Sequence, residues 1–197
     1  MNFLAHLFLS GPPGEIMLGN FMADSVTAAM KPAYSGEIQK GLRLHHAIDA
    51  FTDKHPVVQQ SKERLREPYH KYAPVIVDIF YDHFLAAEWS RFSNTSLRDF
   101  ADAAYSFLGS QSALLPERSM HFYRYMHTTD ALYNYSQISG IRRVMKGMAS
   151  RASIGSGMED SPDALVMHYD AFKEEFLTFF PELMEMSASF LREEMGR

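Results

Sequence analysis

Ionisable and amide side chains recur at a spacing of four residues in apolar segments of the N-terminal half of the chain. The groups are Asn2 with His6, Asn20 with Asp24, His45 with Asp49 and Asp53, and Asp78 with Asp82, which His83 follows directly. Residues four apart on an α-helix are offset by only about 40°, so they share one face. An unpaired carboxylate in apolar surroundings is costly. We therefore expect four helices to direct these groups toward one interior point.

Metal binding is the chemistry that such an arrangement favours. Carboxylate and imidazole groups on facing helices form a common cage for one or two hard divalent cations. A bound cation lowers the pKa of water and polarises a phosphoryl oxygen, which permits hydrolysis at neutral pH. Because the chain has no Cys, the ligand set suits Mn²⁺, Mg²⁺, Fe or a His-rich Zn²⁺ site. The same pairs also fit hydrogen bonds between neighbouring side chains, or helix caps, with no metal at all.

Motifs for other chemistries are weak or missing in the sequence. Gly155-Ser156-Gly157 lacks the spacing and the strand–turn–helix setting of a nucleophile elbow. The sequence has no Walker loop and no dinucleotide-binding fingerprint. The 19 Lys and Arg residues against 24 Asp and Glu residues leave a formal net charge of −5. This balance argues against a dedicated nucleic-acid-binding protein.

The elements that must position these side chains are helices. The 197 residues, 46% of them hydrophobic, fit one domain with a substantial core. Apolar residues follow helical spacing nearly throughout, so we expect an all-α, single-domain helical bundle over residues 1–197. A charged stretch (62–68), a small loop (154–157) and a break or kink at Pro181 separate some of the elements. The expected helices cover 2–10, 15–30, 36–54, 74–91, 97–108, 116–126, 129–135, 139–150, 161–180 and 182–194.

The apolar N-terminal segment does not fit a secretory signal. No Lys or Arg precedes Lys31, and His6 interrupts the apolar run. No later run approaches the roughly 20 apolar residues of a membrane helix. We expect a cytoplasmic protein without a membrane partner, and the sequence does not indicate its oligomeric state.

Six short motifs occur in order along nearly the whole chain. They are N-F-L-A-H-L at 2–7, G-N-x-x-A-D at 19–24, H-x-x-I-D-x-x-T-D at 45–53, D-x-x-x-D-H-F at 78–84, G-M-A-S-R at 147–151 and H-Y-D at 168–170. Together they resemble the acyl carrier protein phosphodiesterases, a family regarded as a divergent branch of the helical, metal-dependent HD phosphohydrolases. The resemblance implies an HD-type helical fold.

The resemblance also implies an activity. It is hydrolysis of the phosphodiester that joins 4'-phosphopantetheine to a serine of holo-acyl carrier protein, which gives the apo carrier and free phosphopantetheine, with Mn²⁺ as cofactor. Two positions depart from the expected pattern. His45-His46 stands where His-Arg is expected, so His46 places a titratable ring where a cation would contact phosphate. Asp82-His83 reverses the order of the usual HD dyad.

Candidate roles follow from the residue types and the resemblance together. Asp78 precedes Asp82 by one turn, so it would orient a ligand histidine or accept a proton from metal-bound water. Asp53 has a similar supporting role, and His168 would donate a proton to the departing serine oxygen, unless it makes only a structural bond. The predicted metal-binding residues are His6, Asp24, His45, Asp49, Asp82 and His83.

Two groups of cations are candidates for contact with a phosphodiester or an acidic carrier, although such groups are also typical of solvated faces. One group is Arg142, Arg143, Lys146 and Arg151, and the looser group is Lys62, Arg64, Arg66 and Lys71. Arg151 is the preferred phosphate contact because it lies inside a motif that resembles the family's. The aromatic runs at 121–125 and 133–135 fit either a slot for the pantetheine arm or core packing. The predicted substrate-binding residues are Arg142, Arg143, Lys146 and Arg151.

Two other functions fit the same sequence. One is an HD-type phosphohydrolase that acts on a nucleotide or another small phosphodiester, with the same metal site and no surface for a carrier. The other is a non-catalytic helical protein whose polar pairs only fix the register of its helices.

Overall fold

Helices make up most of the chain in the computed structural model, which describes residues 1–152 and 155–195. No β-strand occurs in this part of the chain, and the predicted all-α class is confirmed. Residue 154 of the predicted loop lies outside the described residues. The α-helices are α1 (Phe3–Leu9), α2 (Glu15–Met22), α3 (Gly36–Lys54), α4 (Pro56–Tyr69), α5 (Ala73–Ala87), α6 (Leu97–Ser110), α7 (Glu117–Thr129), α8 (Ala131–Asn134), α9 (Ile138–Ala149), α10 (Ser161–Met167) and α11 (Tyr169–Met195).

Short 3₁₀ helices join several of these elements, and the helix ends follow local sequence signals. The hydroxyl of Ser35 accepts a hydrogen bond from the backbone N–H of Ile38 and caps α3. Ser96 caps α6 in the same way. Pro56 and Pro74 lie in the first turns of α4 and α5, where a missing N–H costs nothing. The 3₁₀ helices are η1 (Ala23–Ser25), η2 (Lys31–Ala33), η3 (His70–Tyr72), η4 (Trp89–Arg91), η5 (Ser112–Leu114) and η6 (Met158–Asp160).

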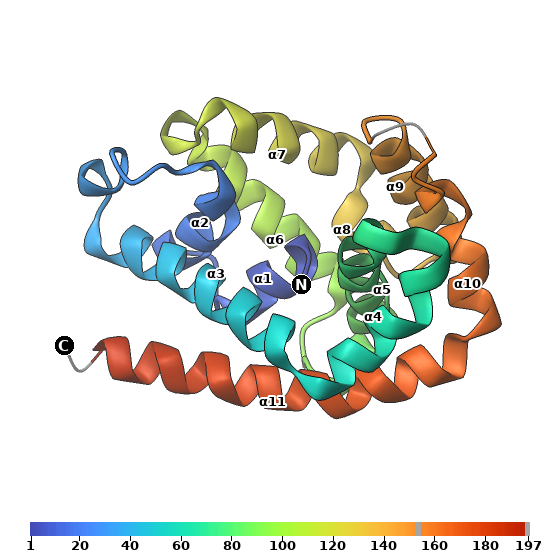
Figure 1. The fold of residues 1–197 in the computed structure, drawn as a ribbon. Helices are drawn as coiled ribbons and strands as arrows, with labels where there is room; N and C mark the ends of the chain where they lie inside the picture. The colour runs from blue at the N-terminus through green and yellow to red at the C-terminus, as the bar shows by residue number, and fades with distance from the viewer. Residues whose placement is uncertain (153–154, 196–197) are drawn as a thin grey trace.

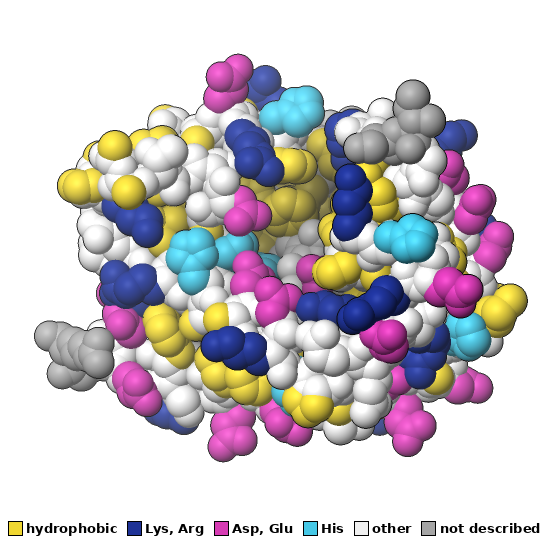
Figure 2. Space-filling model, in the orientation of Figure 1, with side chains coloured by type: hydrophobic (Ala, Val, Ile, Leu, Met, Phe, Trp, Pro, Cys, Tyr) yellow, Lys and Arg dark blue, Asp and Glu magenta, His cyan; other side chains and the backbone are white. Residues whose placement is uncertain are grey.

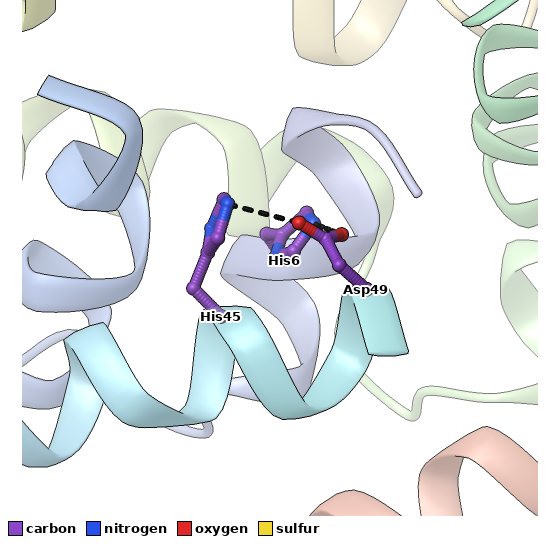
Figure 3. Close-up of side chains that lie close together, drawn as sticks. All are labelled: His6, His45 and Asp49. Carbon is purple, nitrogen blue, oxygen red and sulfur yellow. Dashed lines mark ion pairs between the residues drawn. The ribbon is translucent and has the colours of Figure 1, made fainter. Parts of the chain in front are cut away.

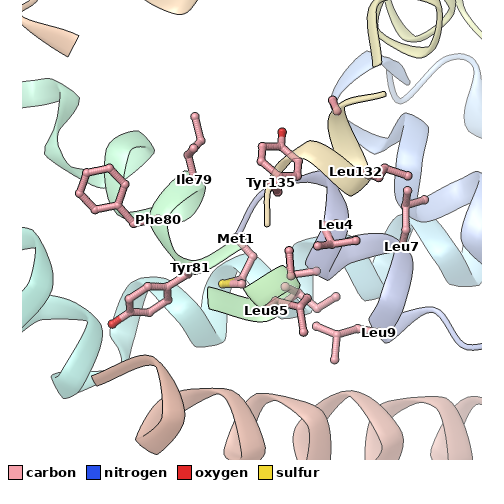
Figure 4. Packing of buried hydrophobic residues seen from close by; sticks show 14 of the residues in the cluster. Met1, Leu4, Leu7, Leu9, Ile79, Phe80, Tyr81, Leu85, Leu132 and Tyr135 are labelled. Carbon is pink, nitrogen blue, oxygen red and sulfur yellow. The ribbon is translucent and has the colours of Figure 1, made fainter. Parts of the chain in front are cut away.

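The short helix α1 lies in the middle of the molecule, with α3 beside it, α7 across the top and the long α11 along the bottom (Figure 1). Buried side chains from α1, α5 and α8, among them Leu4, Leu85 and Leu132, pack together in the core (Figure 4). On its other side α5 packs against α11, where Phe84 contacts Phe176. Burial of these large apolar side chains is the main force that holds the bundle together.

Two glycines bring α2 and α3 into unusually close contact. A Cβ atom at Gly19 would lie 2.0 Å from the backbone oxygen of Ile38, and one at Gly41 would lie 2.1 Å from the backbone oxygen of Ile16. Neither position has room for a side chain. This close approach sets Asn20 of α2 directly against α3.

Three predicted element boundaries were wrong. Helix α2 ends at Met22 rather than Met30, because the chain passes into a 3₁₀ turn over Ala23–Ser25 and Val26 is extended. The charged stretch 62–68 lies within helix α4. The C-terminal helices divide at His168 instead of Pro181, which is exposed inside α11.

None of the described helices combines the length and apolar character that a membrane span requires.

Candidate metal site

Three predicted metal-binding residues meet at one point between α1 and α3. One ligand atom each from His6, His45 and Asp49 lies within 4.8 Å of the others. The two Asp49 oxygens divide between the rings, with Oδ1 3.2 Å from His6 Nε2 and Oδ2 3.2 Å from His45 Nε2. The rings stack with centroids 4.2 Å apart, and both point toward the carboxylate (Figure 3). The structure therefore gathers two imidazoles and a carboxylate from two helices.

Asp24 extends this group from the side of α2. Its Oδ1 lies 3.3 Å from His45 Nε2, and its side chain is 71% exposed. Asp24 lies in the 3₁₀ helix η1, which directly follows the end of α2. Asp24 is thus a fourth donor at the solvent side of the group, which we call the His/Asp group: His6, Asp24, His45 and Asp49.

Asn20 fixes the orientation of both histidine rings. Its Oδ1 accepts a hydrogen bond from His6 Nδ1 at 2.8 Å and one from His45 Nδ1 at 3.1 Å, and its backbone oxygen lies 2.9 Å from His45 Nδ1. Its amide nitrogen donates to the backbone oxygen of His6 and to the hydroxyl of Ser10. With Nδ1 protonated and engaged, each ring turns Nε2 toward the carboxylates. The sequence pattern singled out Asn20 beside Asp24, but not this role.

Burial and charge set different protonation states for the two histidines. Burial lowers the pKa of His6, which favours the neutral ring. Burial also opposes charge on His45, but hydrogen bonds and charge from Asp24 and Asp49 outweigh it and raise the pKa of His45 to about 9. The histidines in turn hold the pKa of Asp49 well below its usual range, despite partial burial. Without a cation, the His45 ring carries the positive charge that compensates the carboxylates.

This donor set fits a divalent cation. Two imidazole nitrogens and carboxylate oxygens suit Mn²⁺, Fe or Zn²⁺, and the fixed Nδ1 partners give the rings the tautomer that metal binding needs. A cation between the Nε2 atoms and the carboxylates would replace the His45 proton. Its ligands would be His6, His45 and Asp49, with Asp24 at the open side.

Asp78 and Asp53 line the cavity of about 370 Å³ that contains the His/Asp group. Asp78 Oδ1 lies 3.1 Å from the backbone amino group of Met1, whose nitrogen is 3.8 Å from Asp49 Oδ1. Asp53 pairs with Lys62 at 2.8 Å. Both carboxylates thus line the same cavity as the site, and among the described residues neither is paired with His6 or His45.

Asp82 and His83 do not join the His/Asp group. Asp82 is fully buried and its two oxygens accept the backbone N–H groups of Leu4 and Ala5, at 2.8 and 3.2 Å, so it caps α1. His83 Nδ1 donates to the backbone oxygen of Tyr135 at 2.8 Å, and its Nε2 lies 3.1 Å from the Tyr169 hydroxyl. The expectation that both would lie among the ligands does not match these positions, because both ends of each side chain are already bonded elsewhere.

His168 and His46 also lie apart from the site. His168 is exposed at the junction of α10 and α11, with its ring against Phe172. It lines neither the cavity of the His/Asp group nor the cavity that Arg151 lines, so the predicted proton donor lies away from the site. His46 is exposed on α3, and its ring meets that of His45 edge-on at 5.7 Å.

The predicted cations separate into different positions. Arg151 lines a second cavity, of about 410 Å³, together with Arg118, which the sequence did not single out. Arg142 pairs with Asp163 at 2.6 Å. Arg143 and Lys146 are exposed on α9 outside both cavities, within the residues that the structure describes. In the looser group, Lys62 pairs with Asp53, Arg64 with Glu175 and Arg66 with Glu63.

The fold and the site define a class: an all-helical protein in which a cavity holds a His/Asp group whose donor atoms fit a divalent cation. Sequence comparison gives the particular family. The family model described as acyl carrier protein phosphodiesterase matches residues 1–183, and the chain belongs to this family.

Individual relatives agree with the family model. The chain is 34% identical over 186 residues to the acyl carrier protein phosphodiesterase of Photorhabdus laumondii, with 94% of each chain covered. It is 34% identical over 185 residues to the protein of that name in Enterobacter sp. strain 638, which covers 93% of this chain and 96% of the relative. The corresponding Escherichia coli O6:H1 protein is 32% identical over 189 residues, with 95% and 98% covered. No solved structure matches the chain.

Proposed function

We propose that this protein hydrolyses the phosphodiester between 4'-phosphopantetheine and a serine of holo-acyl carrier protein, and that the reaction depends on a metal ion. Membership in the acyl carrier protein phosphodiesterase family supports the substrate. The observation that carries the metal-dependent mechanism is the convergence of His6, His45 and Asp49, with both histidines held by Asn20. Mn²⁺ is the proposed cofactor, with Mg²⁺ or Fe as alternatives.

A bound cation would supply a water of lowered pKa and a positive charge for a phosphoryl oxygen. The residues of the chain have separate tasks. His6, His45 and Asp49 would hold the cation, and Asn20 keeps both imidazoles in the tautomer that metal binding needs. Asp78, in the same cavity, is the proposed acceptor of the proton that the attacking water loses. Asp53 lines the same cavity and is held by its ion pair with Lys62.

In the proposed reaction one bond at phosphorus breaks and one forms, and the proton that the water loses is balanced by the proton that the serine oxygen gains. The water oxygen forms a new bond to phosphorus, and the bond between phosphorus and the serine oxygen breaks. The serine oxygen takes up a proton, so the products are the apo carrier and 4'-phosphopantetheine. His168 is not assigned to this proton transfer, because it lies outside the cavity of the His/Asp group.

The mass of the carrier tests this proposal directly. We expect chelator-treated protein to leave holo-carrier unchanged, and added Mn²⁺ to restore conversion to apo-carrier with loss of one phosphopantetheine. A generic phosphodiester and nucleotides, tested in parallel with Mn²⁺, measure the competing activity on small substrates. Unchanged carrier together with rapid turnover of a nucleotide would overturn the proposed substrate.

The remaining expectations about the cell stay predictions. We predict a cytoplasmic location and no membrane partner, and the net charge of −5 argues against a nucleic-acid partner; localisation and pull-down experiments test these predictions.

A further inference from the structure

A second cavity adjoins the cavity of the His/Asp group. It has a volume of about 410 Å³, in the range of pockets that hold small ligands. Figure 2 shows a hollow in this face of the molecule, with histidine and acidic side chains at one edge and hydrophobic side chains inside. Five residues line both cavities, so the second begins where the first ends: Asn2, Phe3, Phe21, Asp24 and Val75.

The walls of the second cavity, which we call the apolar slot, are mostly apolar. Helix α7 supplies one wall and helix α9 supplies the other. Phe122 and Val144 are only half-buried, so the slot is open rather than filled by its own side chains. Tyr135 adds a hydroxyl that accepts a hydrogen bond from Asn2 at 2.8 Å. Residues of α7, α9 and η6 that line the slot include Phe122, Tyr125, Met126, Val144, Met148 and Met158.

Two arginines give the apolar slot positive charge. Arg118 and Arg151 both line it and both are exposed. The Arg118 guanidinium lies 5.7 Å from the centre of the Phe122 ring, which keeps it over the slot wall. Guanidinium groups bind phosphate and carboxylate through paired N–H donors. The slot therefore combines an apolar channel with cations that would meet an anionic ligand or an acidic protein.

We propose that the apolar slot binds the pantetheine arm of the carrier while its phosphodiester lies at the His/Asp group. This inference rests on the proposed function and names the part of the site that recognises the substrate. The arm is a flexible chain of methylene and amide groups with a geminal dimethyl branch and a terminal thiol. A phosphorus atom at the His/Asp group leaves this arm to extend past Phe3 and Phe21 into the slot.

The carrier, rather than coenzyme A, is the proposed source of the arm. Both carry phosphopantetheine, but the carrier joins it to an acidic folded protein. The exposed positions of Arg118 and Arg151 suit contact with such a surface. A higher affinity for coenzyme A than for holo-carrier would overturn this assignment.

Methionine methyl groups report on the slot without any substitution. Met126, Met148 and Met158 line it, whereas Met167 is 76% exposed on α10 and lines neither cavity in the described part of the chain. We expect 4'-phosphopantetheine, added to Mg²⁺-loaded protein, to shift the methyl resonances of the slot methionines and leave that of Met167 in place. Unshifted slot methionines at saturating ligand would overturn the proposal.

A matched pair of tryptophan substitutions tests the slot in turnover. We expect Val144→Trp to fill the slot and raise the KM for holo-carrier by about tenfold or more, while Val166→Trp, at a position 53% exposed on α10, leaves it unchanged. Equal KM values in both variants would refute the slot and leave the proposed activity standing. Slot methionine shifts in a protein that never converts holo-carrier would instead support the slot and refute the proposed function.

Discussion

Asn20 links the two histidines of the site through a single side chain. Its carbonyl oxygen accepts from both rings, and its amide nitrogen is bonded to the backbone of α1 and to Ser10. Every polar atom of this buried side chain therefore has a partner, which makes its orientation fixed. Since the oxygen must face the rings, both Nδ1 atoms are donors and both Nε2 atoms face the carboxylates, where a cation would bind.

Removal of this side chain should weaken metal binding. We expect Asn20→Ala to lower Mn²⁺ affinity by about 10–100-fold, as for other groups that orient metal ligands. Ser10→Ala is the matched control, because it removes a partner of Asn20 and leaves both contacts to histidine intact. Calorimetric titration measures both variants. Equal Mn²⁺ affinity in the two variants would refute the orienting role of Asn20.

Metal binding should also release a proton at neutral pH. The raised pKa of His45, about 9, means that this ring is charged at pH 7 in the absence of a cation, whereas the lowered pKa of His6 leaves that ring neutral. Mn²⁺ must displace the His45 proton, so affinity should rise about tenfold per pH unit from pH 7 toward 9. Calorimetry in buffers of different ionisation enthalpy measures the released proton. An affinity that is flat over this range would show that His45 is already neutral.

At the scale of the helices, Asp82 caps the N-terminus of α1, because the N-cap residue Asn2 makes no capping hydrogen bond with its own side chain. Asn2 makes no side-chain cap, and the Asp82 carboxylate on α5 accepts two N–H groups of the first turn. This contact fixes α1, and with it His6, against the core. Burial raises the pKa of Asp82 to about 7.

Two substitutions separate capping from charge. Asp82→Ala leaves two buried N–H groups without an acceptor and should lower the free energy of unfolding by about 2–4 kcal/mol. Asp82→Asn keeps one acceptor and should cost about 1 kcal/mol. Because the folded pKa lies above that of an unfolded Asp, the wild type should lose stability relative to Asp82→Asn as pH rises from about 4 to 7. Urea unfolding measures this, and parallel pH profiles would contradict it.

The sequence predicted which residues share a helix face more reliably than where that face points. His45 and Asp49 have a solvent side and a buried side on α3, so the inward direction was determined. Helix α5 is buried on nearly every side around Asp82 and His83, and its spacing therefore could not tell which neighbour each side chain meets. Helix α4 was not predicted because its many charged residues obscure the helical spacing of its buried apolar residues Val58, Leu65 and Tyr69.

At the scale of the whole molecule, a net charge of −5 coexists with exposed arginines beside the apolar slot. The spacing of apolar residues predicted the all-α class, and the lack of Cys limited the possible metal ligands to imidazole and oxygen groups, because both inferences need only residue types and periodicity. The slot depends on how α7, α9 and the N-terminal helices are placed around one cavity, which no local pattern encodes. For this reason Arg118 was not predicted as a substrate-binding residue, whereas Arg151 was predicted from the motif that contains it, and both line the slot.

Charge reversal at the slot should affect encounter with the carrier. We expect Arg151→Glu to raise the KM for holo-carrier by about tenfold at low salt, and the difference from wild type to shrink as salt screens the charges. Arg192→Glu, an exposed position on α11, is the control for a change in net charge alone. An increase of the same size in both variants would argue against docking at the slot.

Mn²⁺ binding by neighbouring histidine variants tests the central claim most directly. His45 faces Asp24 and Asp49, while His46, the next residue, is exposed. Electron paramagnetic resonance of free Mn²⁺ during titration gives the affinity of each protein. The site described above predicts that His46→Ala binds like wild type and that His45→Ala loses about 100-fold or more in affinity. Equal binding by wild type, His45→Ala and His46→Ala would contradict a metal site at the His/Asp group.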